Sequence, residues 1–242
     1  MTQKSYGLMS PEYMYIMQDG NETLYGCDQD WYKIEWRRRA GCGPVAATNI
    51  LFYLQKKYGV EAIPYSNGSV DEALSAMNDI FTYVRPKRRG LHTVRKFVKG
   101  MCKFGHRYGL SIRYKYIIVP PQAEKRPCFD EVSGFVEEGL MKDVPVVFLN
   151  LHAGEVEDQL QSWHWVTVVG MKKTGLPEDG SADGEASGET VLLQYYDQSK
   201  SLEVDLGRWL KTTMSGGGFA YFCKPSPRIR KMKRNNTVGG AV

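Results

Sequence analysis

The sequence contains little cysteine and no long apolar run. Its 242 residues include five cysteines, which is too few for a disulfide-built scaffold, and an odd count leaves at least one thiol unpaired within the chain. No two cysteines have CxxC spacing, and the four histidines do not cluster with them, so we expect no metal site. The longest apolar runs, such as residues 144–149, are far shorter than the roughly 18 residues that span a bilayer.

The N-terminal segment lacks the continuous apolar core of a secretory signal. It carries a single lysine among scattered polar residues, which is a poor match to a signal peptide. We therefore expect an intracellular, cytoplasmic protein without a transmembrane segment. The composition, 42% hydrophobic and 24% charged, is typical of a folded globular domain and excludes disordered and fibrous classes.

Acidic residues are missing from a long stretch of the chain. None lies between Asp79 and Glu124, where eleven basic residues occur: Arg85, Lys87, Arg88, Arg89, Arg95, Lys96, Lys99, Lys103, Arg107, Arg113 and Lys115. Such a stretch is most often a solvated face, but residues 85–115 are also a candidate surface for an anionic partner. The sequence has no RNA- or DNA-binding motif, so we do not expect nucleic acid to be that partner.

The charge pattern also indicates how the chain is organised. We interpret residues 1–242 as a single domain with a core from about residue 25 to 224. Residues 174–190 are acidic and rich in Gly and Ser, and we interpret them as a mobile surface loop between two strands. Residues 225–242 include the run RIRKMKR and predict a loose basic tail.

Hydrophobic periodicity predicts helices in the first half and strands in the second. The apolar spacing favours helices over residues 43–58, 91–108 and 129–141, and a capping box at Ser69 to Glu72 begins another that extends to about Phe81. Alternation and β-branched residues predict strands over 111–119, 144–151, 163–171, 190–197 and 218–223. This distribution predicts an α+β fold, with a helical half packed on an antiparallel sheet.

The segment GCGPVAATNIL places Cys42 between two glycines at the start of a predicted helix. Glycines allow a sharp turn and a close approach to a ligand, and Pro44 suits the first helical turn. The helix dipole then favours the thiolate form of Cys42, the nucleophilic form. The alternative is a small buried core residue, which the glycine setting disfavours. The other four cysteines lack such a setting and are interpreted as packing residues.

A thiolate nucleophile needs a base, and the base needs an orienting group. His164 begins the alternating strand WHWVTVVG, and Asp197 ends the strand VLLQYYD, so pairing of the two strands would bring both side chains together. His152 is a rival base, and Asp205 is a rival acid that looks more like a helix cap. Trp163 and Trp165 flank the base, where they either wall a cleft or pack on opposite faces of the sheet.

The order of these residues resembles that of papain-like cysteine peptidases. The segments GCGPVAATNILFYL, HWVTVVG and YYDQSKS followed by DLGRW are most similar to the bacteriocin-leader (double-glycine) peptidase branch and its stand-alone relatives. The resemblance covers about residues 25–222 and implies a papain-like fold with a Cys42-His164-Asp197 triad. It also implies a glutamine upstream of the cysteine, and Gln29 is the matching residue, whose amide would join the Cys42 N–H in an oxyanion hole.

The predicted chemistry is acyl transfer without a metal or organic cofactor. His164 would deprotonate Cys42, the thiolate would attack a peptide or amide carbonyl, and Asp197 would orient the imidazole. The expected partner is a peptide or protein substrate. Two alternatives remain open: a transferase that passes the acyl group to an amine in place of water, and a catalytically inactive binding module with a basic surface.

Overall fold

The protein is built around a seven-stranded antiparallel sheet. A computed structural model describes residues 2–18, 22–176 and 190–228. The strand order is β5-β10-β6-β7-β8-β9, and β1 pairs with β7 as well. These strands are β1 (Thr2–Gly7), β5 (Tyr114–Val119), β6 (Val146–Asn150), β7 (His164–Leu176), β8 (Thr190–Asp197), β9 (Lys200–Asp205) and β10 (Gly217–Phe222). The long strand β7 pairs with β6 through its first half and with β1 through its second, while β8 lies along its other edge.

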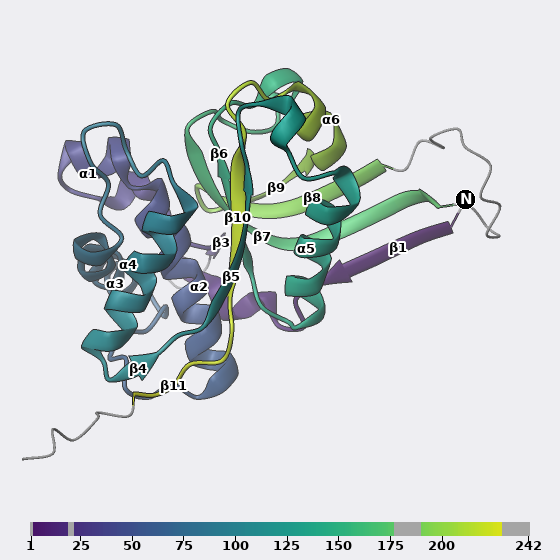
Figure 1. Ribbon diagram of the computed structural model, residues 1–242. Coiled ribbons are helices and arrows are strands. Elements are labelled where there is room, and N and C mark those ends of the chain that lie inside the picture. Colours follow the sequence, from purple (N-terminus) through teal and green to yellow (C-terminus); the bar gives the residue numbers. More distant parts are fainter. Residues whose placement is uncertain (1, 19–21, 177–189, 229–242) are drawn as a thin grey trace, which may run out of the picture.

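Helices cover both faces of the sheet. Figure 1 shows the sheet nearly edge-on, with α1 to α4 on one side and α5 and α6 on the other. The larger group is α1 (Glu35–Ala40), α2 (Cys42–Tyr58), α3 (Val70–Tyr83) and α4 (Val94–Arg107), and the smaller group is α5 (Phe129–Met141) and α6 (Leu206–Thr212). Short elements complete the described chain: η1 (Pro11–Met14), β2 (Tyr15–Gln18), β3 (Glu22–Tyr25), η2 (Gln29–Trp31), β4 (Leu110–Ser111), η3 (Ala123–Lys125), η4 (Gly154–Val156) and β11 (Ser226–Pro227).

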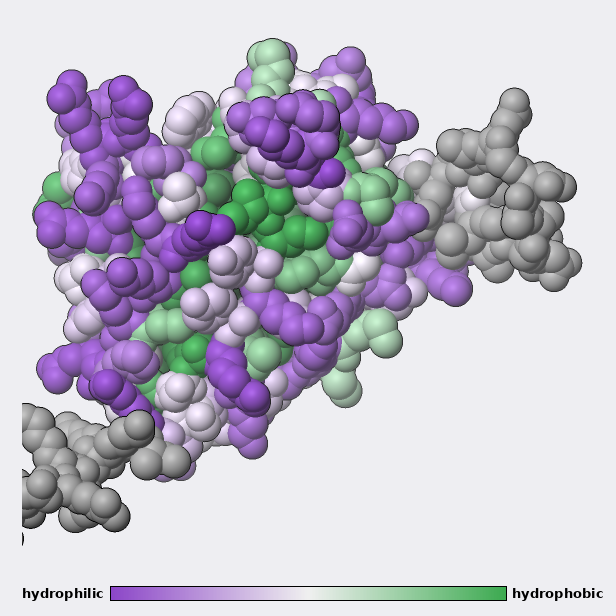
Figure 2. Space-filling view, in the orientation of Figure 1, coloured by the Kyte–Doolittle hydropathy of each residue, from purple (hydrophilic) through white to green (hydrophobic). Residues whose placement is uncertain are grey.

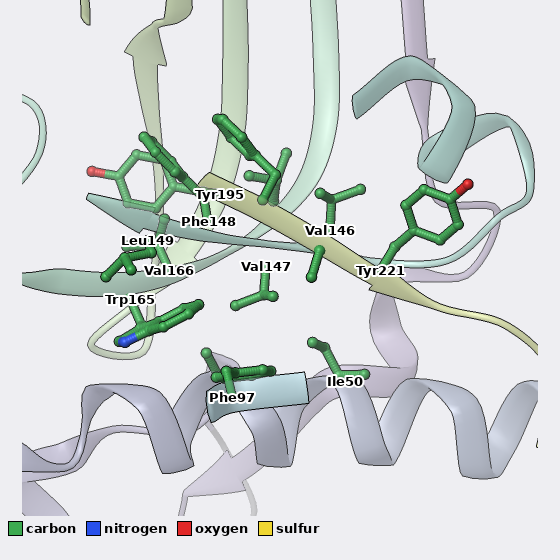
Figure 3. Close-up of a cluster of buried hydrophobic side chains, with 14 of the residues drawn as sticks. Ile50, Phe97, Val146, Val147, Phe148, Leu149, Trp165, Val166, Tyr195 and Tyr221 are labelled. Carbon is green, nitrogen blue, oxygen red and sulfur yellow. The ribbon is translucent and has the colours of Figure 1, made fainter. Parts of the chain in front are cut away.

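The core lies on both faces of the central strands, because successive side chains in a strand point to opposite sides. In Figure 3, Val147 and Trp165 point toward the helix that carries Ile50, whereas Phe148 and Tyr221 lie on the other side of the sheet. Every residue of β6 and of β10 is buried. Burial on both faces explains why these strands are continuous apolar runs in the sequence.

The surface is mostly hydrophilic. Figure 2 shows charged and polar side chains over most of the face in view, with an apolar area near its middle, over β5 and β10. On the edge strand β5, the side chains of Tyr114, Tyr116 and Ile118 are 37–41% exposed. No helix within the described ranges has the length and apolar character needed to cross a membrane.

The predicted α+β class is confirmed, since helices and antiparallel strands are both abundant. Helix α5 has the predicted bounds, 129–141, and α2, α3 and α4 agree with the prediction to within a few residues at their ends. Strands β7 and β8 pair as a hairpin, as the sequence predicted. The capping box is only half formed: Ser69 accepts from the N–H of Glu72 at 3.3 Å, but the Glu72 carboxylate bonds Ser66.

Several elements were not predicted. Strands β1 and β9 lie at exposed positions of the sheet and carry few apolar residues, so hydrophobic alternation does not mark them. Strand β1 belongs to the sheet although it lies outside the predicted core of residues 25–224. Strand β11 lies in the predicted basic tail and pairs with β4. Most of the predicted acidic loop and most of that tail, residues 177–189 and 229–242, lie outside the described residues.

Candidate active site

Cys42 is the first residue of α2, the helix whose middle turns are almost wholly buried. Gly41 precedes it, and the N–H of Val45 bonds the Gly41 carbonyl at 2.9 Å to close the first turn. The helix therefore begins at Cys42, one residue before the predicted range of 43–58, and Pro44 lies in its first turn. The first N–H groups of an α-helix have no partner within the helix, and they carry its positive dipole end. Cys42 therefore lies at the positive end of the α2 dipole.

The glycines beside Cys42 are required for close packing, which corrects the prediction that they provide a sharp turn. Gly41 has an ordinary helical φ of −84°. A Cβ at Gly41 would lie 2.4 Å from the Arg37 carbonyl oxygen and 2.6 Å from the Tyr32 ring, and a Cβ at Gly43 would lie 2.8 Å from Leu91. The two glycines let neighbouring segments approach the cysteine from either side.

His164 and Asp197 lie together on adjacent antiparallel strands. His164 is the first residue of β7 and Asp197 is the last of β8, so the pairing brings them to the same end of the sheet. The His164 Nε2 lies 2.8 Å from the Asp197 Oδ1, and the side chains are only 6% and 11% exposed. We call Cys42, His164 and Asp197 the Cys-His-Asp corner.

The electrostatics of His164 link all three residues of this corner. Burial opposes a charge on the ring, but hydrogen bonds to Asp197 and Cys42, together with the charges of both, outweigh it and raise the pKa of His164 to about 10. Since Nε2 is bound to Asp197, the other ring nitrogen, Nδ1, is the one left to face the thiol. Asp197 and Cys42 therefore both favour the imidazolium form of His164.

Asn49 is a buried residue that fixes helix α2 against strand β7. Its Oδ1 accepts from the N–H of Cys27 at 2.8 Å, and its Nδ2 lies 3.3 Å from the Thr167 hydroxyl oxygen on β7. Asn49 is 1% exposed and Thr167 is 0% exposed. Because Cys42 and His164 lie on these same two elements, this polar bridge sets their relative position. The sequence analysis missed Asn49, although a polar residue in an otherwise apolar helical run is the signal that marks it.

Gln29 belongs to η2, next to the Asp197 end of the corner. The preceding residue, Asp28, accepts from the Ser199 hydroxyl at 3.5 Å. Burial raises the pKa of Asp28, and the charge of Asp197 contributes to this shift. Gln29 is half-buried, and its described hydrogen bond is made by its backbone carbonyl, which accepts from the N–H of Tyr32 at 3.2 Å. Its role as an oxyanion donor therefore stays a prediction.

The rival residues have other roles in the structure. The Nδ1 of His152 accepts from the N–H groups of Gly154 and Met214 at 3.1 and 3.3 Å, so it organises a turn. Asp205 accepts from the N–H of Arg208 at 2.9 Å as the N-cap of α6, as predicted. Of the other cysteines, Cys27 is buried, and Cys128 is exposed at the N-cap of α5.

An open cleft of about 490 Å³ exposes Cys42 to solvent. Its apolar walls are Trp36, Leu91, Leu151 and Trp163. Trp36 and Trp163 are 45% and 59% exposed, which is high for indoles. Trp163 has a φ of 58°, a region that bulky residues rarely occupy and that is often found at functional sites.

Trp165 differs from its neighbour at Trp163 and belongs to the core. It is 2% exposed, and its ring stacks on Phe97 with centroids 4.6 Å apart. Its Nε1–H donates to the Leu91 carbonyl at 2.5 Å. The two tryptophans that flank His164 therefore have different roles: Trp163 lines the cleft, and Trp165 packs in the core beneath it.

Three arginines complete the cleft and define what we call the basic rim: Arg39, Arg88 and Arg89. Arg39 comes from α1, and the other two come from the turn before α4. Two of the three fall in the acid-free stretch of the sequence, but no feature of the sequence predicts that this stretch lies beside Cys42. Within residues 2–18, 22–176 and 190–228, no group of His, Cys, Asp and Glu side chains is arranged to hold a metal ion.

No family model matches this chain, and the comparison with curated proteins finds no match either.

Proposed function

We propose that the protein is a papain-like cysteine peptidase or amidase, with Cys42 as the nucleophile, His164 as the acid and base, and Asp197 as the orienting group. The observation that carries the proposal is His164, which is buried, lies 2.8 Å from Asp197 and interacts with the Cys42 thiol. Two further features support it. Cys42 begins a helix that packs against the sheet, and it opens into a cleft large enough for a peptide segment.

The proposed reaction has two half-reactions. In the first, the Cys42 sulfur bonds the carbonyl carbon of the scissile bond, and the electron pair of the carbonyl moves to its oxygen. The tetrahedral intermediate then expels the amine as the C–N bond breaks, and the His164 imidazolium gives its proton to the leaving nitrogen. In the second, His164 takes a proton from water, the resulting hydroxide attacks the thioester, and the thiolate leaves.

The negative oxygen of the tetrahedral intermediate needs hydrogen-bond donors. The N–H of Cys42 is available because it lies in the first turn of α2, where helix N–H groups have no intrahelical acceptor. The amide of Gln29 is the proposed second donor, since η2 lies beside the Asp197 end of the corner.

The first test is the reactivity of Cys42 with iodoacetamide, followed by mass spectrometry of each cysteine between about pH 5 and 9. We expect rapid alkylation of Cys42 at the acidic end of this range, where ordinary thiols are protonated. The His164→Ala variant should lose this reactivity. Cys128 is a matched internal control, because it is exposed at a helix N-terminus but is not joined to a histidine in the described structure.

The second test is hydrolysis of a peptide mixture, with cleavage products identified by mass spectrometry. Cys42→Ala should abolish cleavage, whereas Cys128→Ala should retain it, and circular dichroism should show both variants folded. Product analysis with an added amine such as glycinamide separates hydrolysis from transfer. Cleavage that persists in Cys42→Ala, or a Cys42 that alkylates no faster than Cys128, would overturn the proposal.

A further inference from the structure

The basic rim lies directly beside the proposed nucleophile. Arg88 and Arg89 occupy a tight turn in which Lys87 and Gly90 bond each other, N–H to carbonyl, at 3.2 and 2.7 Å. Leu91 anchors the end of this turn, since it is 6% exposed and its carbonyl accepts from Trp165. The close approach of Leu91 to Gly43 ties the turn to the first turn of α2, so the two arginines hold a fixed place at the mouth of the cleft.

The described contacts of the rim arginines contribute little to the stability of the fold. Arg39 has one described ion pair, 3.6 Å from Glu35, in which both side chains are about three-quarters exposed. Arg88 and Arg89 are exposed, and neither forms an ion pair with any described residue. The neighbouring Arg38 shows the contrast, because it donates to the Tyr32 carbonyl at 2.9 Å and is half-buried. The rim thus keeps its guanidinium groups available to a ligand.

Among the described residues, the lining of the cleft contains no carboxylate to balance these charges. Its members are the basic rim, Cys42, backbone and small residues, and the apolar walls. Apolar walls with few charged groups are typical of ligand sites, and arginine is the preferred partner of carboxylates because its planar donors match them. A single exposed ion pair contributes little, but converging arginines at the mouth of an apolar cleft discriminate between ligands of opposite charge.

We propose that the cleft selects acidic peptides, in which an Asp or Glu side chain lies next to an apolar residue near the scissile bond. The apolar side chain would contact the indoles of Trp36 and Trp163, and the carboxylate would contact Arg88 and Arg89. This inference rests on the proposed function, because it names the substrate class of the same site. It also gives a specific role to part of the acid-free stretch, residues 85–115.

The test uses chloroacetyl-Leu-Xaa-Leu amides, where Xaa is Glu, Gln or Lys, as alkylating peptides. Labelling of Cys42 is followed by mass spectrometry and is normalised to labelling of Cys128. We expect the Glu peptide to label Cys42 roughly three- to thirtyfold faster than the Lys peptide, from two favourable charge contacts. The preference should weaken in about 1 M NaCl, because salt screens exposed charges.

Two double variants separate the rim from the general charge of the protein. Arg88→Gln/Arg89→Gln should abolish the preference for Glu over Lys. Arg95→Gln/Lys99→Gln removes the same charge from exposed positions of α4 that do not line the cleft, and it should keep the preference. Arg89→Glu should reverse the preference toward the Lys peptide.

The outcomes distinguish the two proposals. Equal labelling by all three peptides, or a preference that survives Arg88→Gln/Arg89→Gln, would overturn the selection of acidic peptides whether or not the protein hydrolyses peptides. A rim-dependent preference without any peptide hydrolysis would support the acidic selectivity and overturn the peptidase proposal. Equal loss of preference in both double variants would assign the effect to net charge and would also overturn the role of the rim.

Discussion

The Cys-His-Asp corner reaches the cleft through Cys42, beside the basic rim, but the corner and the rim are built in opposite ways. In the corner, His164 and Asp197 are almost fully buried and 2.8 Å apart, and Asn49 ties α2, which carries Cys42, to β7, which carries His164. In the rim, Arg88 and Arg89 are exposed and have no ion-pair partner among the described residues. Their backbone is fixed by the turn, while their side chains are in solvent.

This contrast assigns catalysis to the corner and the selection of substrates by charge to the rim. Proton transfer and nucleophilic attack need groups held at hydrogen-bond distance, which buried contacts provide. Charge selection acts over a longer range and tolerates mobile side chains, because it depends on the local potential. Changes in the corner should therefore affect all substrates alike, and changes in the rim should affect substrates according to their charge.

The largest expected effect comes from Asp197→Asn. The amide keeps the size of the side chain but removes the charge that orients and stabilises the His164 imidazolium, so we expect kcat/KM to fall on the order of 10²- to 10⁴-fold for every peptide. The matched control is Asp205→Asn, since Asn caps a helix about as well as Asp. That variant should retain activity and stability. Similar losses from both substitutions would contradict a special role for Asp197.

The pH profile sharpens the same comparison. Because the pKa of His164 is raised to about 10, the imidazolium that protonates the leaving amine should persist to that pH, and kcat/KM should fall tenfold per pH unit above it. Asp197→Asn should move this alkaline limb to lower pH, because Asp197 is one of the groups that raise the pKa. Arg88→Gln/Arg89→Gln should leave the limb close to its original position, because the rim does not contact the ring.

The raised pKa of His164 also makes the free energy of unfolding depend on pH. The folded pKa of His164 lies above its ordinary value of 6.5, so its contribution to the free energy of unfolding is present below pH 6.5 and is lost as the pH rises through about 10. Urea unfolding at pH 6.5 and 10 should show a smaller loss in Asp197→Asn than in the wild type. An equal loss would show that other groups control the alkaline destabilisation.

Asn49→Ala tests whether the corner depends on the buried bridge. The change leaves the Cys27 N–H and the Thr167 hydroxyl without their described partner, and we expect the free energy of unfolding to fall by about 2–3 kcal/mol. Thr167→Val removes only the longer of the two contacts and should cost about 1 kcal/mol. Both are measured by urea unfolding, and activity per folded molecule should fall more in Asn49→Ala. Unchanged stability in Asn49→Ala would show that apolar packing alone positions α2.

The sequence predicted the corner far better than the rim, for a physical reason. Cys42, His164 and Asp197 each lie at the end of an element that hydrophobic periodicity marks, and antiparallel pairing of two strands joined by a loop brings His164 and Asp197 together. Arg39 and Arg89 line one cleft because Leu91 packs beside Gly43, a tertiary contact between distant segments that periodicity does not encode. The strands β1 and β9 were missed because exposed strands need little apolar alternation.

The smallest expected effects are changes in the free energy of unfolding when the two indoles of the cleft are replaced, and the two changes have opposite signs. Trp163 has a positive φ of 58° and is 59% exposed, so Trp163→Asn should raise the free energy of unfolding by about 0.5–1 kcal/mol, because Asn tolerates this conformation. Trp36 lies in α1. Because Asn is a poorer helix former than Trp, Trp36→Asn should lower the free energy of unfolding by roughly a few tenths of a kcal/mol. Both variants should label more slowly with the Leu-containing alkylating peptides, because each removes an apolar wall. If Trp163→Asn instead destabilised the protein, the indole of Trp163 would contribute to the stability of the fold. Trp163 would then belong with the buried corner and not with the solvent-exposed walls of the cleft.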